Sequence, residues 1–117
     1  MIQIVSPRSV GRGQWLKGFV EVKKEDLEGA RAVEAIFYNS ITYGRDKKNY
    51  SSWKYSKKVS AREAMERGEI PFEFEVKEFA PITYSGKAVI SKWKLKVKVD
   101  IEGALDKEIE EEVAVFR

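Results

Sequence analysis

The fold is decided by the stretch Pro81-Ile82-Thr83-Tyr84-Ser85-Gly86-Lys87-Ala88-Val89-Ile90-Ser91-Lys92-Trp93-Lys94-Leu95-Lys96-Val97-Lys98-Val99-Asp100-Ile101. Its first six residues contain a proline and a glycine and are typical of a turn. From residue 92 onward, apolar side chains occupy every odd position and charged side chains every even one. A period of two indicates an extended strand with one buried face and one solvent-exposed face.

Other parts of the chain repeat this pattern, and we expect strands at residues 2–5, 15–22, about 32–43, 70–76 and about 108–116. Residues 7–13 contain one proline and two glycines, which predicts a loop. The segment that begins at Glu25 is ambiguous, and we expect a turn there before the strand at 32–43. Glu111 falls on the buried parity of the last strand, so that strand should lie at a sheet edge or end there.

One short helix is expected near residues 60–67. Ser60 and Glu63 have capping-box spacing, in which each side chain satisfies a backbone donor at the helix start, and Gly68 lies where the helix would end. A chain of mostly alternating segments with one short helix predicts an all-β fold, an antiparallel immunoglobulin-like β-sandwich, forming a single domain over residues 1–117.

Composition limits the setting in which this chain works. Its 117 residues can bury a core without disulfides, and there is no cysteine to form one. The start of the chain lacks the apolar core of a signal peptide, and no run reaches the roughly 18 apolar residues of a membrane helix. We therefore expect a cytoplasmic protein. The excess of lysine and glutamate among its charged residues predicts a thermophilic source.

Three segments carry a family resemblance. They are Gln14-Trp15-Leu16-Lys17-Gly18-Phe19-Val20-Glu21-Val22, then Ile70-Pro71-Phe72-Glu73-Phe74, and then Ala80-Pro81-Ile82-Thr83-Tyr84-Ser85-Gly86 with the alternating strand ending near Asp100. In this order they resemble the arrestin-like superfamily, including its prokaryotic sporulation-control branch. The resemblance implies an arrestin-like β-sandwich that acts as an adaptor without catalysis. Family members commonly have two sandwiches, whereas this chain has room for one.

The residue inventory gives little support to an enzyme. With no histidine and no cysteine, the commonest general base, the thiol nucleophile and the usual transition-metal ligands are missing. No phosphate-binding loop or nucleophile elbow is present. We expect no cofactor and no catalytic residue. The glutamates at 108, 110, 111 and 112 could bind a hard cation, but they lack a recognisable loop motif, so we expect no metal site.

The lysines at 92, 94, 96 and 98 form a charged row on one strand face. Such a row could bind a polyanion. It could also pair with Glu108, Glu110 and Glu112, which share one face of the last expected strand. We favour the second interpretation.

The better candidate for a binding surface lies in residues 43–58. Residues 1–58 contain twelve Lys/Arg and six Asp/Glu, a net charge of +6. Residues 59–117 contain ten Lys/Arg and thirteen Asp/Glu, a net charge of −3. Basic and aromatic side chains alternate in this segment, and they can neutralise phosphates or carboxylates while rings stack on bases. The same pattern also suits an ordinary strand with Trp53 and Tyr55 on one side. The candidate residues are Arg45, Lys47, Lys48, Tyr50, Trp53, Lys54, Tyr55, Lys57 and Lys58.

Two functional hypotheses follow. The first is a non-catalytic adaptor module that binds a protein or acidic peptide partner through an edge strand and this basic surface, or pairs with itself through edge strands. The alternative is a single-stranded nucleic-acid binding protein that uses Tyr50, Trp53 and Tyr55 as stacking platforms.

Overall fold

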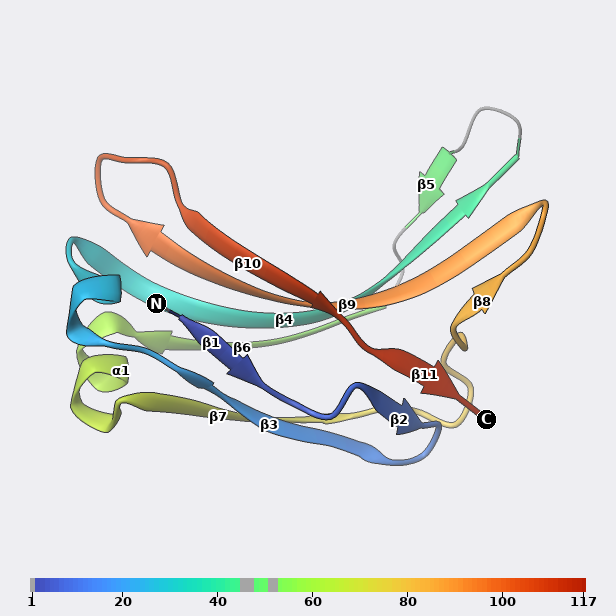
Figure 1. Ribbon diagram of the computed structural model, residues 1–117, viewed down its shortest axis with the longest axis horizontal. Helices are drawn as coiled ribbons and strands as arrows, with labels where there is room; N and C mark the ends of the chain where they lie inside the picture. The colour runs from blue at the N-terminus through green and yellow to red at the C-terminus, as the bar shows by residue number, and fades with distance from the viewer. Residues whose placement is uncertain (1, 45–47, 51–52) are drawn as a thin grey trace.

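The computed structural model describes residues 2–44, 48–50 as backbone, and 53–117. Figure 1 shows two layers of strands that face each other. The smaller sheet has the order β1-β3-β7, and the larger sheet runs β10-β9-β4-β5, with β6 also paired to β4 and β8 to β9. The strand bounds are β1 Gln3–Val5, β2 Ser9–Gly11, β3 Trp15–Glu21, β4 Ala30–Tyr43, β5 Lys48–Tyr50, β6 Lys54–Ser60, β7 Glu69–Glu75, β8 Tyr84–Ser85, β9 Val89–Ile101, β10 Lys107–Glu112 and β11 Ala114–Phe116.

The predicted all-β sandwich with one short helix is confirmed. The decisive alternating stretch forms β9, a central strand bonded antiparallel to β4 on one side and β10 on the other. The four apolar residues from Trp93 to Val99 are at most 1% exposed, and the intervening lysines face outward. The period of two in the sequence therefore corresponds to one face in the core and one face in solvent.

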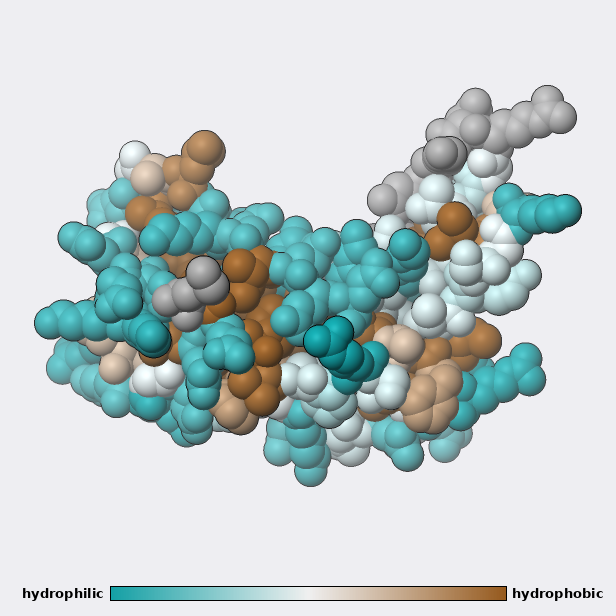
Figure 2. Space-filling model, viewed as in Figure 1, coloured by the Kyte–Doolittle hydropathy of each residue, from teal (hydrophilic) through white to brown (hydrophobic). Residues whose placement is uncertain are grey.

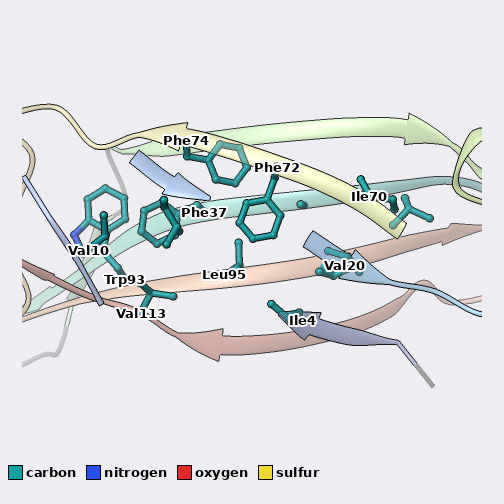
Figure 3. Packing of buried hydrophobic residues seen from close by; sticks show 14 of the residues in the cluster. Ile4, Val10, Val20, Phe37, Ile70, Phe72, Phe74, Trp93, Leu95 and Val113 are labelled. Atoms are coloured by element: carbon teal, nitrogen blue, oxygen red, sulfur yellow. The ribbon is translucent and has the colours of Figure 1, made fainter. Parts of the chain in front are cut away.

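Aromatic rings fill the centre of the core, where side chains from the two sheets point toward one another (Figure 3). The ring of Phe37 on β4 stacks on Trp93 with centroids 4.7 Å apart, and on Phe74 from the opposite sheet at 6.2 Å. The indole Nε1 of Trp93 donates a hydrogen bond of 2.8 Å to Pro81 O. This bond satisfies the polar atom of a buried ring and fixes the turn before β8 against the core.

The helix α1 spans Ala61–Arg67, as the capping pattern predicted. The Ser60 hydroxyl oxygen accepts a hydrogen bond of 3.1 Å from Glu63 N, and Gly68 ends the helix with φ of 72°. Ala61 and Ala64 form the buried side of the helix. A 3-10 turn at Lys24–Leu27 occupies the place where we expected a turn before β4.

Two expectations at the chain ends need correction. Residues 7–13 are not all loop, because Ser9–Gly11 forms β2. The expected last strand is divided into β10 and β11, with Val113 buried between them and its N–H bonded to Trp93 O. After this break the chain leaves the large sheet, and β11 pairs parallel with β2. The other described strand pairs are antiparallel.

Candidate functional site

The edges of the two sheets are where this fold leaves backbone groups available to a partner. In the described part of the chain, β5, β6, β8 and β10 each pair on one side only in the large sheet, and β1 and β7 do so in the small sheet. Strand β6 covers only the first half of β4, from Ala32 to Tyr38, and β5 covers Ile41 to Tyr43. Asn39 lies where the neighbour of β4 changes from β6 to β5. Its N–H donates a hydrogen bond to Trp53 O, and its side-chain amide donates one of 3.0 Å to Ser91 Oγ.

The structure divides the predicted basic and aromatic segment between two strands and two sides of a sheet. Arg45 and Lys47 lie outside the described residues. Lys48 and Tyr50 belong to β5, where their backbones pair with Tyr43 and Ile41. The remaining candidates precede or occupy β6, so the nine predicted residues do not all come from one continuous strand.

The two aromatic candidates near β6 pack against other rings. Tyr55 is half-buried, and its ring lies 6.1 to 6.2 Å from the rings of Phe37, Phe74 and Trp93. Trp53 is also half-buried, and the centre of its ring lies 5.5 Å from that of Phe79. Their side chains therefore serve the sandwich, which was the structural interpretation of their alternation.

The lysines of β6 point to different sides. Lys54 and Lys58 are exposed on the outer face of the large sheet, opposite Tyr38 and Glu34 of β4. Lys57 has the other parity and is half-buried. It lines a narrow groove between β6, α1 and the start of β7, together with Val59, Glu63, Ala64, Arg67, Glu69, Ile70 and Pro71.

The lysine row of β9 is neutralised by β10, as the favoured interpretation predicted. Lys92, Lys94 and Lys96 form ion pairs with Glu112, Glu110 and Glu108 at 3.6, 3.4 and 3.9 Å, and Lys98 pairs with Asp106 at 3.3 Å. Each of these glutamates pairs with a diagonal neighbour, not with the lysine that lies directly opposite it on β9. In Figure 2 the upper side is hollowed between the two ends of the large sheet and lined by hydrophilic side chains.

A tyrosine that sequence reasoning did not single out completes this charged face. The Tyr38 hydroxyl donates a hydrogen bond of 2.6 Å to Glu110 Oε2, and Lys96 Nζ lies 5.4 Å from the centre of the Tyr38 ring. Burial and the bond to Glu110 raise the pKa of Tyr38 to about 12. Burial pushes the pKa of Glu110 upward, but the Tyr38 bond and the Lys94 and Lys96 charges outweigh it, so that pKa is lowered. From the sequence, Tyr38 and Glu110 could be assigned to two expected strands, but nothing in it indicated that they form a hydrogen bond.

No ion pair to Lys54, Lys57 or Lys58 occurs among the residues that the structure describes. The lysines of β9 do form ion pairs, because β9 lies between two strands, whereas β6 has a strand on one side only. Two lysines of nearly equal sequence context, Lys54 and Lys94, therefore differ in whether their charge is already matched. We take the free edge of β6 with these three lysines as the candidate site.

The acidic cluster gives no metal centre in the described residues, where no group of three or more potential ligands is arranged to hold an ion. Glu108, Glu110 and Glu112 instead bind lysines, while Glu111 is exposed on the other face of the edge strand. In the same residues, no helix is long and apolar enough to span a membrane.

Solved structures with a related fold include two proteins with different described roles. The sporulation control protein Spo0M from Bacillus subtilis matches 99% of this chain with a TM-score of 0.60 and 18% identity. The chain spans about half of that protein, 49% of its length. A superoxide reductase (neelaredoxin) from Ignicoccus hospitalis matches 98% of this chain and is covered over 80% of its own length, with a TM-score of 0.52 and 16% identity.

These likenesses establish a fold related to that of Spo0M, as the sequence resemblance implied, and at such low identity they establish the fold alone. No protein-family model matches the sequence, and no curated protein sequence does. Function has to be argued from the site itself.

Proposed function

We propose that this chain is a non-catalytic interaction module that binds a protein or an acidic peptide through the free edge of β6 and its lysines. One observation carries the proposal. Lys54, Lys57 and Lys58 lie on or beside an unpaired strand edge without an ion pair among the described residues, whereas the lysines of the adjacent sheet face are matched by β10.

The physical argument combines two sources of affinity. An edge strand presents N–H and C=O groups that another backbone can bond, and lysine ammonium groups form charge-assisted hydrogen bonds to carboxylates. Lysine on an edge also repels basic strands and discourages aggregation. An acidic segment meets no such barrier, so it is the partner chemistry that this edge selects.

The fold relationship supports a regulatory role without identifying it. Spo0M is described as a sporulation control protein. Together with the three sequence segments that resemble the arrestin-like superfamily, this supports placing the chain in the sporulation-control branch. The proposed activity is recruitment of a partner.

A reductase activity like that of the second neighbour is not favoured by the residues of this chain. Histidine and cysteine, the usual ligands for redox-active transition metals, are missing from the sequence. Glu108, Glu110 and Glu112 of the acidic cluster are bound to lysines. Nucleic-acid binding is also less well supported, because Trp53 and Tyr55 are packed against other rings instead of presenting free faces.

The test is binding of a fluorescein-labelled glutamate-rich peptide, measured by fluorescence anisotropy at low salt. Lys54→Glu, Lys57→Glu and Lys58→Glu are combined in one variant. Its matched control carries Lys17→Glu, Lys24→Glu and Lys87→Glu, three exposed lysines elsewhere with the same total charge change. Because exposed ion pairs contribute about 0.2–1 kcal/mol each, we expect roughly tenfold weaker binding for the β6 variant.

The control should bind within about twofold of the unchanged chain once both variants are shown to be folded by circular dichroism. Equal weakening in the two variants would mean that net charge alone attracts the peptide, and would remove β6 as the site. Absence of binding by the unchanged chain at low salt would remove the acidic-peptide function.

A further inference from the structure

We infer that the partner binds β6 as an added strand whose residues alternate between acidic and apolar. This inference rests on the proposed function and specifies the form of its ligand. The acidic side chains would lie over Lys54 and Lys58 on the outer face, and the apolar side chains would lie on the inner face beside the half-buried Tyr55 and Val59.

Among the six described edge strands of the two sheets, β6 is the one best suited to accept a strand. β1, β5 and β8 have only two or three residues each, and β7 contains Pro71, which lacks a backbone donor. β10 has six residues and carries glutamates that already bind lysines of its neighbour. β6 has seven residues with no proline or glycine, and its outward side chains are two lysines and two serines. A seven-residue edge offers three or four backbone pairs to an incoming strand.

The chain contains its own example of such a complex, because β10 binds β9 in this way. Glutamates 108, 110 and 112 occupy the outer face over lysines 94, 96 and 98 in register, while Ile109 packs against the core. The ion pairs are displaced by one diagonal step, so each carboxylate binds the lysine two residues before the one directly opposite. A lysine-bearing strand of this sheet therefore already holds a neighbour with carboxylates at alternate positions, and on the other face of that neighbour Ile109 is the apolar residue between Lys107 and Glu111.

The surroundings of β6 repeat these features on its open side. Outward positions 54 and 58 carry ammonium groups, and Ser56 between them is small. Inward, Tyr55 and Val59 are half-buried. The narrow groove beside them is lined by Val59, Ala64, Ile70 and Pro71 together with the charged residues Lys57, Glu63, Arg67 and Glu69, of which Arg67 pairs with Glu63. A partner strand with acidic residues at alternate positions would match the outer lysines and place its apolar residues beside Tyr55 and Val59.

The test compares three peptides of eight residues. The first alternates glutamate with valine, the second has the same composition in two blocks of four, and the third is the alternating peptide with N-methyl groups on the amides of one edge. Affinities come from isothermal titration calorimetry at low salt. Amide hydrogen exchange of residues 54–60 is followed by NMR, because an added strand protects edge N–H groups whereas charge attraction does not.

We expect the alternating peptide to bind about tenfold more tightly than the block peptide, since only alternation places all four carboxylates on the lysine side. N-methylation of the edge that pairs with β6 should remove most of that gain. The double variant Lys54→Glu with Lys58→Glu should abolish the preference. The Lys17→Glu with Lys24→Glu control should retain it.

Other results would separate this inference from the function on which it rests. Equal binding of all three peptides, still lost in the β6 variant, would leave the acidic-peptide function standing and overturn the strand geometry. Concentration-dependent self-association that disappears in the β6 variant would overturn the assignment to a foreign segment, because a second copy would then occupy the edge.

Discussion

The hydroxyl of Tyr38 on β4 donates a hydrogen bond of 2.6 Å to the carboxylate of Glu110 on β10, reaching over the strand β9 that separates them. The same carboxylate lies 3.4 Å from Lys94 Nζ. The Tyr38–Glu110 hydrogen bond thus links β4 to β10 across the outer face of β9, and the same carboxylate also binds a lysine of β9. The lysines of β9 thus have carboxylate partners, whereas Lys54, Lys57 and Lys58 form no ion pair within the part of the chain that the structure describes.

Removing the hydroxyl of Tyr38 should weaken the large sheet. A hydrogen bond to a charged group contributes about 1.5–3 kcal/mol, and partial exposure reduces this, so we expect Tyr38→Phe to lower the free energy of unfolding by about 1 kcal/mol. Urea denaturation followed by circular dichroism measures the change. Tyr84→Phe, at a tyrosine that is 55% exposed, should change it by less than about 0.5 kcal/mol. An equal effect of both substitutions would contradict the role given to the Tyr38 bond.

The same pair predicts how stability depends on alkaline pH. The pKa of Tyr38 is raised from 10.0 to about 12 in the folded state. Its contribution to stability is therefore complete below pH 10 and is lost as the pH rises from 10 to about 12, because the unfolded chain releases the proton first. The melting temperature of the unchanged chain should fall across this window, and that of Tyr38→Phe should fall less steeply.

At acidic pH the sign reverses for Glu110. Its pKa is lowered below the usual 4.5, so its contribution is present above pH 4.5 and is lost as the pH falls through the folded-state value. Thermal melting between pH 2 and 6 should show a shallower acid limb for Glu110→Gln than for the unchanged chain. Glu28→Gln, at an exposed glutamate, provides the comparison and should leave the limb as it is.

Core aromatic residues should contribute far more to stability than exposed ones. Trp93 is 1% exposed, stacks on Phe37 and donates to Pro81 O, so Trp93→Phe loses ring contacts and leaves a carbonyl without its partner. We expect a loss of roughly 2–4 kcal/mol in the free energy of unfolding. Trp15→Phe, at a position that is 50% exposed, should cost less than about 0.5 kcal/mol in the same denaturation experiment.

Glycine 18 should be intolerant of a side chain for a steric reason. A Cβ atom there would lie 2.5 Å from Val5 O on the paired strand β1 and 2.7 Å from the Phe72 ring. We expect Gly18→Ala to destabilise the fold by about 1–3 kcal/mol. Gly68→Ala meets no atom within 4 Å and suffers only from its φ of 72°, at about 1 kcal/mol. A smaller cost at Gly18 than at Gly68 would contradict the close approach of β1 and β3.

Much of the architecture was predictable from local pattern. Alternation gave the faces of β3, β7 and β9, the capping residues Ser60 and Gly68 gave α1, and the pairing of lysines with glutamates followed from their common parity. The short strands β2 and β11 near the chain ends were not predictable, since each has the other as its partner and the two lie far apart in the sequence. A three-residue strand has no periodicity of its own to detect.

What the sequence by itself determined is which side chains share a face, because side-chain direction along an extended chain depends only on residue parity. It could identify Lys54, Lys57 and Lys58 as basic residues in a strand, and Lys92 to Lys98 as a row. Which of these charges is matched was decided by the tertiary structure alone. Strand order is set by contacts between residues far apart in the chain, and that order puts β9 next to acidic β10 and leaves β6 at an open edge.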